Sequence, residues 1–162
     1  MDRLFSPWRS KYIESFAHSK EEKDVCVFCE AQKGSDADHF IIARGKTCFV
    51  IMNLYPYNSG HLMVVPYRHL KELSEMTAEE SLEVMQHLQK MIDALRTVSH
   101  PDGFNLGANL GRSAGAGIDN HIHFHIVPRW KGDTNFMPIL ADTKMISEDM
   151  TETWKKLRNA LK

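Results

Sequence analysis

The sequence predicts a single α+β domain in which an antiparallel sheet packs against helices. Short runs of β-branched and other apolar residues are separated by turn residues, which is typical of hairpins. One long segment carries apolar residues at helical spacing behind a capping motif. Further on, three histidines alternate with apolar residues, as in a strand with one buried face. Strands joined by hairpins, with helices gathered on one side of the sheet, define an α+β domain.

The N-terminal part is expected to contain a helix followed by the first strands. Residues 7–16 place Trp8, Tyr12, Ile13 and Phe16 near helical spacing, and residues 17–24 form a charged connector. Residues 40–43 and 47–52 are apolar runs joined by Arg44-Gly45-Lys46, which predicts a hairpin. A loop with Pro56 and Asn58-Ser59-Gly60 then leads to a strand over residues 61–65.

A long helix is expected to run from the capping box Thr77-Ala78-Glu79-Glu80 to about Val98. Its apolar face is predicted to consist of Leu82, Met85, Leu88, Ile92 and Leu95, with Met91 also packing and His87 on the surface.

The C-terminal part is predicted to complete the sheet and to end in a second helix. Strands are expected over residues 104–110 and 120–127, with a glycine-containing loop between them. A short apolar segment follows over residues 136–140, and residues 147–161 have the pattern of a C-terminal helix.

Size and charge restrict the kind of protein. A chain of 162 residues fits one domain over residues 1–162, and a domain of this size buries roughly 70% of the unfolded surface. With 20 basic and 21 acidic residues, the net charge of −1 predicts neither a nucleic-acid nor a membrane partner. The absence of a long apolar run and of a signal-peptide core, and the odd count of three cysteines, predict a reducing, cytoplasmic location.

The densest chemistry lies between residues 103 and 130. In a strand, His121, His123 and His125 would all face one side, while the residues between them face the core. The glycines upstream would let backbone N–H groups approach an anion closely, and phosphate is the expected guest. Imidazole is a good nucleophile near neutral pH, and the middle position of His123 makes it the candidate nucleophile.

A second constellation is the Cys26-Val27-Phe28-Cys29 motif. Two cysteines at this spacing are compatible with a redox pair, with half of a metal site, or with two buried thiols. The choice depends on which other ligands lie nearby.

These motifs together resemble a known family. His-x-His-x-His followed by apolar residues is the signature of the histidine triad nucleotide hydrolase and transferase superfamily, which implies a HIT-like fold. The accompanying segments Asn53-Leu54-Tyr55-Pro56-Tyr57-Asn58 and Pro128-Arg129-Trp130 are most similar to those of bacterial diadenosine tetraphosphate phosphorylases. The resemblance covers roughly residues 7 to 140.

The resemblance implies a role for individual residues. His123 would attack the α-phosphorus to form a nucleotidyl-histidine, and His125 would hydrogen bond at the scissile phosphate or its leaving oxygen. His61 is expected to stabilise the active-site strand. The remaining substrate-binding positions implied are Asn53, Asn109, Gly115, Ala116, Gly117, Ile118 and Trp130.

The resemblance also implies a metal and an assembly. Cys26 and Cys29 would be joined by His69 and His121 in a zinc site. Such a Cys2His2 set is saturated and therefore structural, because a catalytic zinc keeps an open position. The family's usual dimer would use the helix over residues 78–98 and its neighbouring strand.

Four functions remain open at this point. The first is phosphorolysis of dinucleoside polyphosphates, with nucleotide substrate and inorganic phosphate as partners. The second is hydrolysis of the same substrates, and the third is cleavage of nucleoside phosphoramidates. The fourth is nucleotide binding without catalysis, against which the combination of Asn53, Asn109, His123 and His125 argues.

Overall fold

The computed structural model of the chain describes residues 25–133 and 149–162. The expected helix over residues 7–16 and the apolar segment over residues 136–140 lie outside the described residues. Within the described ranges, no helix is both long and apolar enough to cross a membrane.

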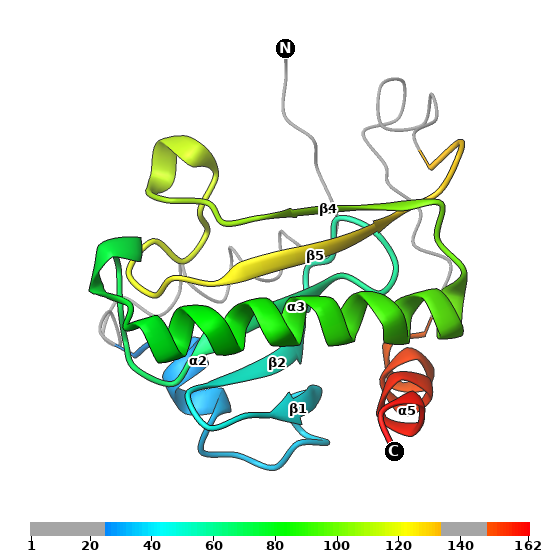
Figure 1. The fold of residues 1–162 in the computed structure, drawn as a ribbon, viewed down its shortest axis with the longest axis horizontal. Helices are drawn as coiled ribbons and strands as arrows, with labels where there is room; N and C mark the ends of the chain where they lie inside the picture. Colours follow the sequence, from blue (N-terminus) through cyan, green and yellow to red (C-terminus); the bar gives the residue numbers. More distant parts are fainter. Residues whose placement is uncertain (1–24, 134–148) are drawn as a thin grey trace.

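A five-stranded antiparallel sheet forms the centre of the fold (Figure 1). Its strands lie in the order β1-β2-β3-β5-β4, so the C-terminal strand β5 is inserted between β3 and β4. The bounds are β1 Ile41–Arg44, β2 Cys48–Met52, β3 Leu62–Pro66, β4 Gly103–Gly107 and β5 Phe124–Arg129. The expected hairpin over residues 40–52 is present as β1 and β2.

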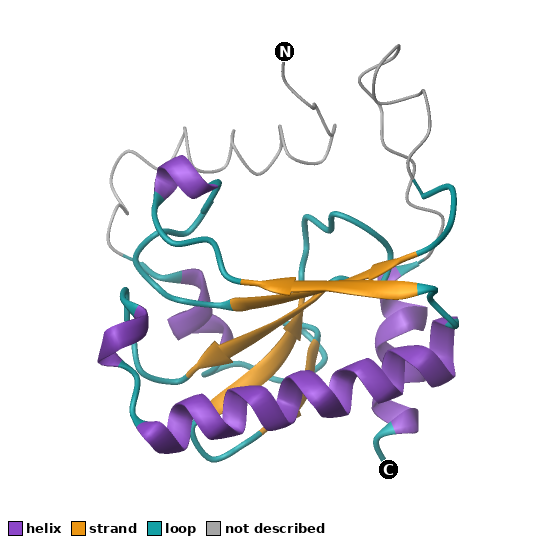
Figure 2. Ribbon diagram, turned by 45° about the horizontal axis from the view of Figure 1, so that its top comes forward, coloured by secondary structure: helices purple, strands orange, loops and turns teal. Residues whose placement is uncertain are grey.

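Helices cover both faces of the sheet. The long helix α3 (Ala78–Ser99) lies along one face, where α5 (Met150–Ala160) joins the same core (Figure 2). The short helix α2 (Val27–Ala31) packs on the opposite face, and the 3-10 turns η1 (Leu73–Glu75) and η2 (Arg112–Ala114) lie in connections. The expectation that all helices gather on one side is therefore wrong for α2. In the sequence, the Cys26–Cys29 motif was considered as a redox pair, part of a metal site or two buried thiols, and no helix was predicted there.

Alternation along the strands explains why both faces can be covered. In β2, Val50 packs toward α3 while Phe49 packs toward α2, and in β3 Val64 and Val65 divide in the same way. Since successive side chains of a strand point to opposite faces, an uninterrupted apolar run produces two cores.

Helix α3 begins at the predicted capping box. The Thr77 hydroxyl accepts the Glu80 N–H at 3.2 Å, and the Glu80 carboxylate accepts the Thr77 N–H at 2.7 Å. The predicted apolar face is rotated, however. The side chains facing the core include Val84, Leu88, Met91 and Leu95.

Three residues of α3 differ from expectation because of this rotation. Leu82 is 61% exposed and Met85 is 54% exposed, although both were placed on the buried face. His87 is half-buried rather than on the surface. The buried residues at positions 84, 88, 91 and 95 have the spacing of one helix face, and so do the residues of the predicted face. Periodicity alone therefore allows either face to be buried, and contact with the sheet decides which one is.

The histidine strand is shorter than predicted. Strand β5 begins at Phe124, so His121 and His123 precede it and only His125 is paired, opposite Met63 of β3 and Gly107 of β4. Strand β4 likewise ends at Gly107 instead of continuing to Leu110. The chain around His123 thus leaves the ladder, which frees its backbone for other contacts.

We predict that Met91→Ala lowers the free energy of unfolding by about 2–5 kcal/mol. Met91 is fully buried between α3 and the sheet, and truncating it leaves a cavity. Gln89→Ala, on the exposed side of the same helix, is the matched control and should stay within about 0.5 kcal/mol of the parent. Urea unfolding measures both. Equal effects of the two substitutions would mean that α3 faces the sheet differently.

Candidate functional site

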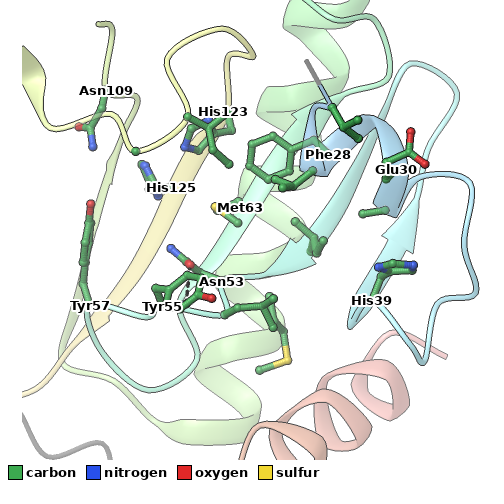
Figure 3. Close-up of a pocket in the computed structure, with 18 of the residues that line it drawn as sticks. Phe28, Glu30, His39, Asn53, Tyr55, Tyr57, Met63, Asn109, His123 and His125 are labelled. Atoms are coloured by element: carbon green, nitrogen blue, oxygen red, sulfur yellow. Dashed lines mark hydrogen bonds between the residues drawn. The ribbon is translucent and has the colours of Figure 1, made fainter. Parts of the chain in front are cut away.

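A pocket of about 410 Å³ opens on the sheet face that α2 covers (Figure 3). Its walls come from α2, from the segment after β2, from the glycine-containing loop before β5 and from the histidine segment. The residues on which the site is built are Phe28, Ile51, Asn53, Leu54, Tyr57, Asn109, Gly115, Gly117, Ile118, His123 and His125. Most of the lining is apolar, and the described residues that line the pocket include no lysine or arginine.

A chain of hydrogen bonds fixes the proton position on His125. The backbone N–H of Tyr57 donates to Nδ1 of His61 at 3.0 Å, so this nitrogen must be unprotonated. The proton of neutral His61 therefore lies on Nε2, which is 2.9 Å from Nδ1 of His125. His125 accepts this bond and, when neutral, must carry its own proton on Nε2.

The Nε2–H group of His125 is a donor without an acceptor. Nε2 is buried, and it has no hydrogen-bond partner in the part of the chain that the structure describes. Burial, with a contribution from His123, lowers the pKa of His125 to about 4, so the ring is neutral at pH 7. A buried donor left unpaired costs free energy, which a ligand oxygen in the pocket would recover.

His123 has the opposite tautomer. Its Nδ1 lies 2.9 Å from the carbonyl oxygen of His121, and only a protonated Nδ1 can donate to a carbonyl. Its Nε2 therefore has a free lone pair. Burial lowers the pKa of His123 below its ordinary value despite this hydrogen bond. The two rings are adjacent, with centroids 4.8 Å apart, so a nucleophile and a hydrogen-bond donor lie side by side.

Two asparagines lie beside this pair of rings (Figure 3). Asn53 accepts the Tyr55 N–H at 2.9 Å, and its amide nitrogen lies 3.3 Å from Nδ1 of His61, so its side chain also holds the loop. The side chain of Asn109 lies in the pocket and forms no hydrogen bond within the described residues. Asn109 therefore offers a complete amide to a ligand.

The loop before β5 approaches the pocket with its backbone. Gly115 and Gly117 line the pocket, and Gly115 has a φ of 89°, in a region that disfavours other residues. Ile118 lines the pocket too, whereas Ala116 is buried and is not among the lining residues.

Next to this pocket, Cys26, Cys29, His69 and His121 converge. Their four ligand atoms lie within 4.8 Å of one another. The Cys26 sulfur is 3.2 Å from Nδ1 of His121, and the Cys29 sulfur is 3.3 Å from Nδ1 of His69 and 3.7 Å from Nδ1 of His121. The two-ligand motif and two histidines distant in sequence thus form one cluster.

The cluster fits a tetrahedral metal ion. Metal–sulfur bonds of about 2.3 Å and metal–nitrogen bonds of about 2.0–2.1 Å give sulfur–nitrogen edges of about 3.5 Å, which the observed distances bracket. Nε2 of His121 donates to the carbonyl of Pro66 at 2.9 Å, which leaves Nδ1 unprotonated toward the cysteines. Burial lowers the pKa of His121 to about 4, so the ring is a neutral ligand at pH 7.

The cysteines need a cation to become thiolates together. Burial and the neighbouring Cys26 raise the pKa of Cys29 to about 11 when no metal is present. A divalent ion reverses this effect because it stabilises the thiolate directly.

The cluster and the pocket share Phe28. This residue lies between the two cysteines, and its ring centroid is 5.5 Å from that of His121 and 4.9 Å from that of His123. Holding α2 in place therefore also positions one wall of the pocket against the candidate nucleophile.

Trp130 does not lie where the sequence analysis expected it. Its indole N–H donates to the carbonyl of Ser99 at 3.3 Å, and Trp130 is not among the residues that line the pocket. Trp130 follows His125 by five residues, and β5 rises about 3.3 Å per residue, so the strand carries it about 16 Å away.

Sequence reasoning missed several residues that line the pocket. Phe28 and Tyr57 were not assigned to the site, and neither was His39. The only signal that could have indicated Phe28 is its place inside the cysteine motif. Tyr57 stands in the segment Asn53–Asn58 that carries the resemblance, but no role was assigned to it; its backbone N–H bonds His61 and its ring centroid is 5.7 Å from that of His125.

The sheet order, the two histidines over a pocket and the loop before β5 define a histidine triad protein. Residues 35–132 match the family described as HIT domain, and the chain belongs to this family.

Two curated proteins that are similar to this chain carry names that state an enzymatic activity. It is 42% identical, over 97% of its own length and 83% of the relative's, to a Mycobacterium tuberculosis protein named AP-4-A phosphorylase. It is 29% identical to the adenosine 5'-monophosphoramidase hnt1 of Schizosaccharomyces pombe, over 64% of this chain and 74% of that one.

Among solved structures, a zinc-bound histidine triad family protein from Mycobacterium smegmatis is similar. It superimposes with a TM-score of 0.69 at 31% identity, covering 84% of this chain and 92% of that chain.

We predict opposite tautomers for the two pocket histidines at pH 7. Long-range ¹H–¹⁵N spectra should show His123 protonated on Nδ1 and His125 protonated on Nε2, because their hydrogen-bond partners differ. The exposed His100 serves as the reference for a solvent-averaged ring. A protonated Nδ1 on His125, or a charged ring, would contradict the hydrogen-bond chain from Tyr57.

Proposed function

We propose that this protein cleaves dinucleoside polyphosphates such as diadenosine tetraphosphate by phosphorolysis. The observation that carries the proposal is the pair of opposite tautomers, which gives His123 a free lone pair beside the unpaired donor of His125. The 42% identity to a protein named AP-4-A phosphorylase supports the substrate class.

In the first step, Nε2 of His123 attacks the α-phosphorus. A bond forms between this nitrogen and phosphorus, and the bond from phosphorus to the bridging oxygen breaks, releasing ATP from diadenosine tetraphosphate. The His123 ring becomes cationic on bonding, and its Nδ1–H keeps its bond to the carbonyl of His121, which stabilises the charge.

His125 would donate its Nε2–H to the oxygen on which negative charge develops. A preorganised buried donor is worth more than one in water, because it needs no reorganisation during the reaction. The Asn109 amide and the backbone N–H groups around Gly115, Gly117 and Ile118 would bind the phosphates, and Asn53 would lie on the ribose side. Neutral donors would thus take the place of lysine or arginine side chains.

In the second step, inorganic phosphate attacks the nucleotidyl-His123 intermediate. The phosphorus–nitrogen bond breaks, ADP forms, and His123 returns to its neutral state. Water in place of phosphate would yield AMP, which is the hydrolase alternative. The S. pombe relative's name indicates a different leaving group in the first step, an amine, for the same type of site.

We further propose that the Cys26, Cys29, His69 and His121 cluster binds zinc. Two sulfur and two nitrogen donors at tetrahedral spacing suit this metal, and the M. smegmatis structure is described as zinc-bound. With four protein ligands, the ion would hold α2 against the segments before β5 and after β3. Its contribution would therefore be structural.

Three further expectations belong to this proposal. Residues 1–162 would act as one domain, because α5 packs onto the same core as the sheet. A homodimer would cover the exposed Leu82 and Met85 of α3 and the edge strand β4, where Leu106 is 49% exposed. The free cysteines suit a reducing cytoplasm.

The proposal predicts that diadenosine tetraphosphate gives ADP and ATP only when inorganic phosphate is present. Product analysis with and without phosphate tests this. AMP and ATP formed without phosphate would establish hydrolysis instead.

His123→Asn provides the matched variant for this assay. It should abolish turnover and the covalent nucleotidyl adduct while the melting temperature stays near that of the parent, because only the nucleophile is lost. The exposed His100→Asn variant should keep full activity. A His123→Asn enzyme that retained more than a few per cent of activity would exclude His123 as the nucleophile.

We predict about one zinc ion per chain in protein purified without chelators. Cys26→Ser should lose the metal and melt at a clearly lower temperature, since zinc binding contributes roughly 10–16 kcal/mol in peptides that fold only around the ion. Cys48→Ala is the control, because Cys48 is a buried cysteine outside the cluster and its loss should leave the zinc content unchanged. Metal-free parent protein, with Cys26→Ser melting at the same temperature, would leave the cysteines as core residues.

A further inference from the structure

The segment after β2 decides which nitrogen of His61 carries the proton. Nδ1 of His61 faces two donors from this segment, the backbone N–H of Tyr57 at 3.0 Å and the amide nitrogen of Asn53 at 3.3 Å. Tyr57 and Asn53 both lie at the end of the pocket where His125 stands (Figure 3). The bond between Nε2 of His61 and Nδ1 of His125 can form with either nitrogen as the donor. The two donors from the segment therefore select one of two arrangements.

The opposite arrangement would reverse the chemistry of His125. If His61 carried its proton on Nδ1, its Nε2 would accept a hydrogen bond from Nδ1 of His125. A neutral His125 would then present a lone pair on Nε2 to the pocket instead of an N–H group. This lone pair would repel the oxygen on which negative charge develops. The contacts that hold the segment after β2 in place thus bear on the reaction.

Asn58, directly after Tyr57, ties this segment to the end of β5. Its side-chain nitrogen donates to the carbonyl of Pro128 at 3.0 Å and to Oδ2 of Asp133 at 2.7 Å. Asn58 is only 8% exposed. Both partners are acceptors, so the amide must turn its NH₂ group toward them, and both N–H bonds of that group are used.

This contact lies beyond the point where the pairing of β3 with β5 stops. The ladder between these strands ends at Leu62 and Ile126, whereas β5 continues to Arg129. The amide of Asn58 reaches the carbonyl of Pro128 in this unpaired part. It therefore continues the hydrogen bonding of β5 past the start of β3 and holds the preceding segment against the strand.

Asp133 makes the other end of this contact rigid. Nη2 of Arg129 donates to Oδ1 of Asp133 at 2.8 Å, while Nε of Arg129 and the backbone N–H of Trp130 donate to Oδ2. Nη1 of Arg129 also donates to Asn105 of β4 at 2.7 Å. The hydrogen bond from Arg129 holds the pKa of Asp133 well below its usual range, so the carboxylate is ionised at pH 7. An ionised acceptor forms a stronger hydrogen bond with Asn58 than a neutral one would.

We infer that Asn58 and Asp133 are positioning residues that fix the tautomer of His125. They act through the segment after β2, whose Tyr57 N–H they hold against His61. Neither Asn58 nor Asp133 is among the residues that line the pocket, so neither touches the substrate in this account. The consequence for the reaction rests on the proposed function, whereas the tautomer itself does not.

The first test replaces Asn58 by leucine, which has a similar size and no N–H donor. In long-range ¹H–¹⁵N spectra at pH 7, Nε2 of His125 should shift from the protonated toward the unprotonated position, and Nδ1 should shift the opposite way. Asp133→Ala should cause the same change. Asp133→Asn, which keeps an acceptor oxygen for Asn58, should retain more of the parent tautomer and is the milder variant where Asn58→Leu does not fold.

A double variant shows whether the two residues act through one contact. The Asn58→Leu, Asp133→Ala protein should shift the His125 signals no further than the more severe single variant does, because both substitutions break the same hydrogen bond. Additive shifts would mean that the two residues act separately, which would overturn the inference.

Glu83→Gln is the matched control for a general loss of stability. The Glu83 carboxylate of α3 accepts the backbone N–H groups of Lys46 and Thr47 in the β1–β2 hairpin, and Glu83 does not line the pocket. This variant should melt at a lower temperature but leave the His125 signals unchanged. Unchanged His125 signals in Asn58→Leu and Asp133→Ala as well would reduce their contact to a structural one and overturn the inference.

Turnover provides a second readout. Asn58→Leu should slow cleavage of diadenosine tetraphosphate about tenfold, less than removal of His125 would, because part of the molecules keeps the correct tautomer. Cleavage of the p-nitrophenyl ester of AMP should slow much less, since that leaving group needs little help from an acid. Equal losses with both substrates would contradict the role of Asn58. A parent protein that cleaves neither substrate, with the tautomer shift still present in the variants, would reject the proposed reaction and leave the inference standing.

Discussion

The chemistry of the site depends on one backbone N–H group. Because Tyr57 donates to Nδ1 of His61, His61 must donate to His125, and His125 must present its remaining proton to the pocket. His123 is fixed in the other tautomer by the carbonyl of His121. Two chemically identical side chains, two residues apart, thereby acquire opposite properties from their partners. Burial keeps both neutral by lowering the pKa of each ring.

The rest of the fold holds these partners in place. Strand β5 pairs His125 with Met63, which sets its distance from His61, the residue before β3. On the other side, the cluster of two cysteines and two histidines ties α2 to the histidine segment, and Phe28 of α2 contacts the His123 ring. Strand β5 begins only at Phe124, so the carbonyl of His121 lies outside the ladder. This carbonyl accepts the hydrogen bond from Nδ1 of His123.

Periodicity and turn chemistry in the sequence were enough to predict the hairpin, the capping box of α3 and the α+β class, since these depend on local patterns. They could not predict which face of α3 is buried, because the stripe with Leu82 and Met85 is as regular as the one with Val84 and Met91. The motif His-x-His-x-His located the site and the resemblance suggested residue roles. The tautomers could not be predicted, because the partner of His125 is the distant His61 and the carbonyl of His121 is available to His123 only where the chain lies outside the ladder. Trp130 was assigned to the site by the resemblance alone, whereas in the structure its indole N–H donates to the carbonyl of Ser99 and Trp130 is not among the residues that line the pocket.

The most direct test of this account is the dependence of His125→Ala on the leaving group. If Nε2–H of His125 donates to the departing oxygen, the substitution should slow cleavage of diadenosine tetraphosphate by about 10²–10⁴-fold. It should slow cleavage of the p-nitrophenyl ester of AMP much less, because that leaving group needs little help from an acid. Equal losses with both substrates would show that His125 only supports His123, and the assignment of the donor would then be wrong.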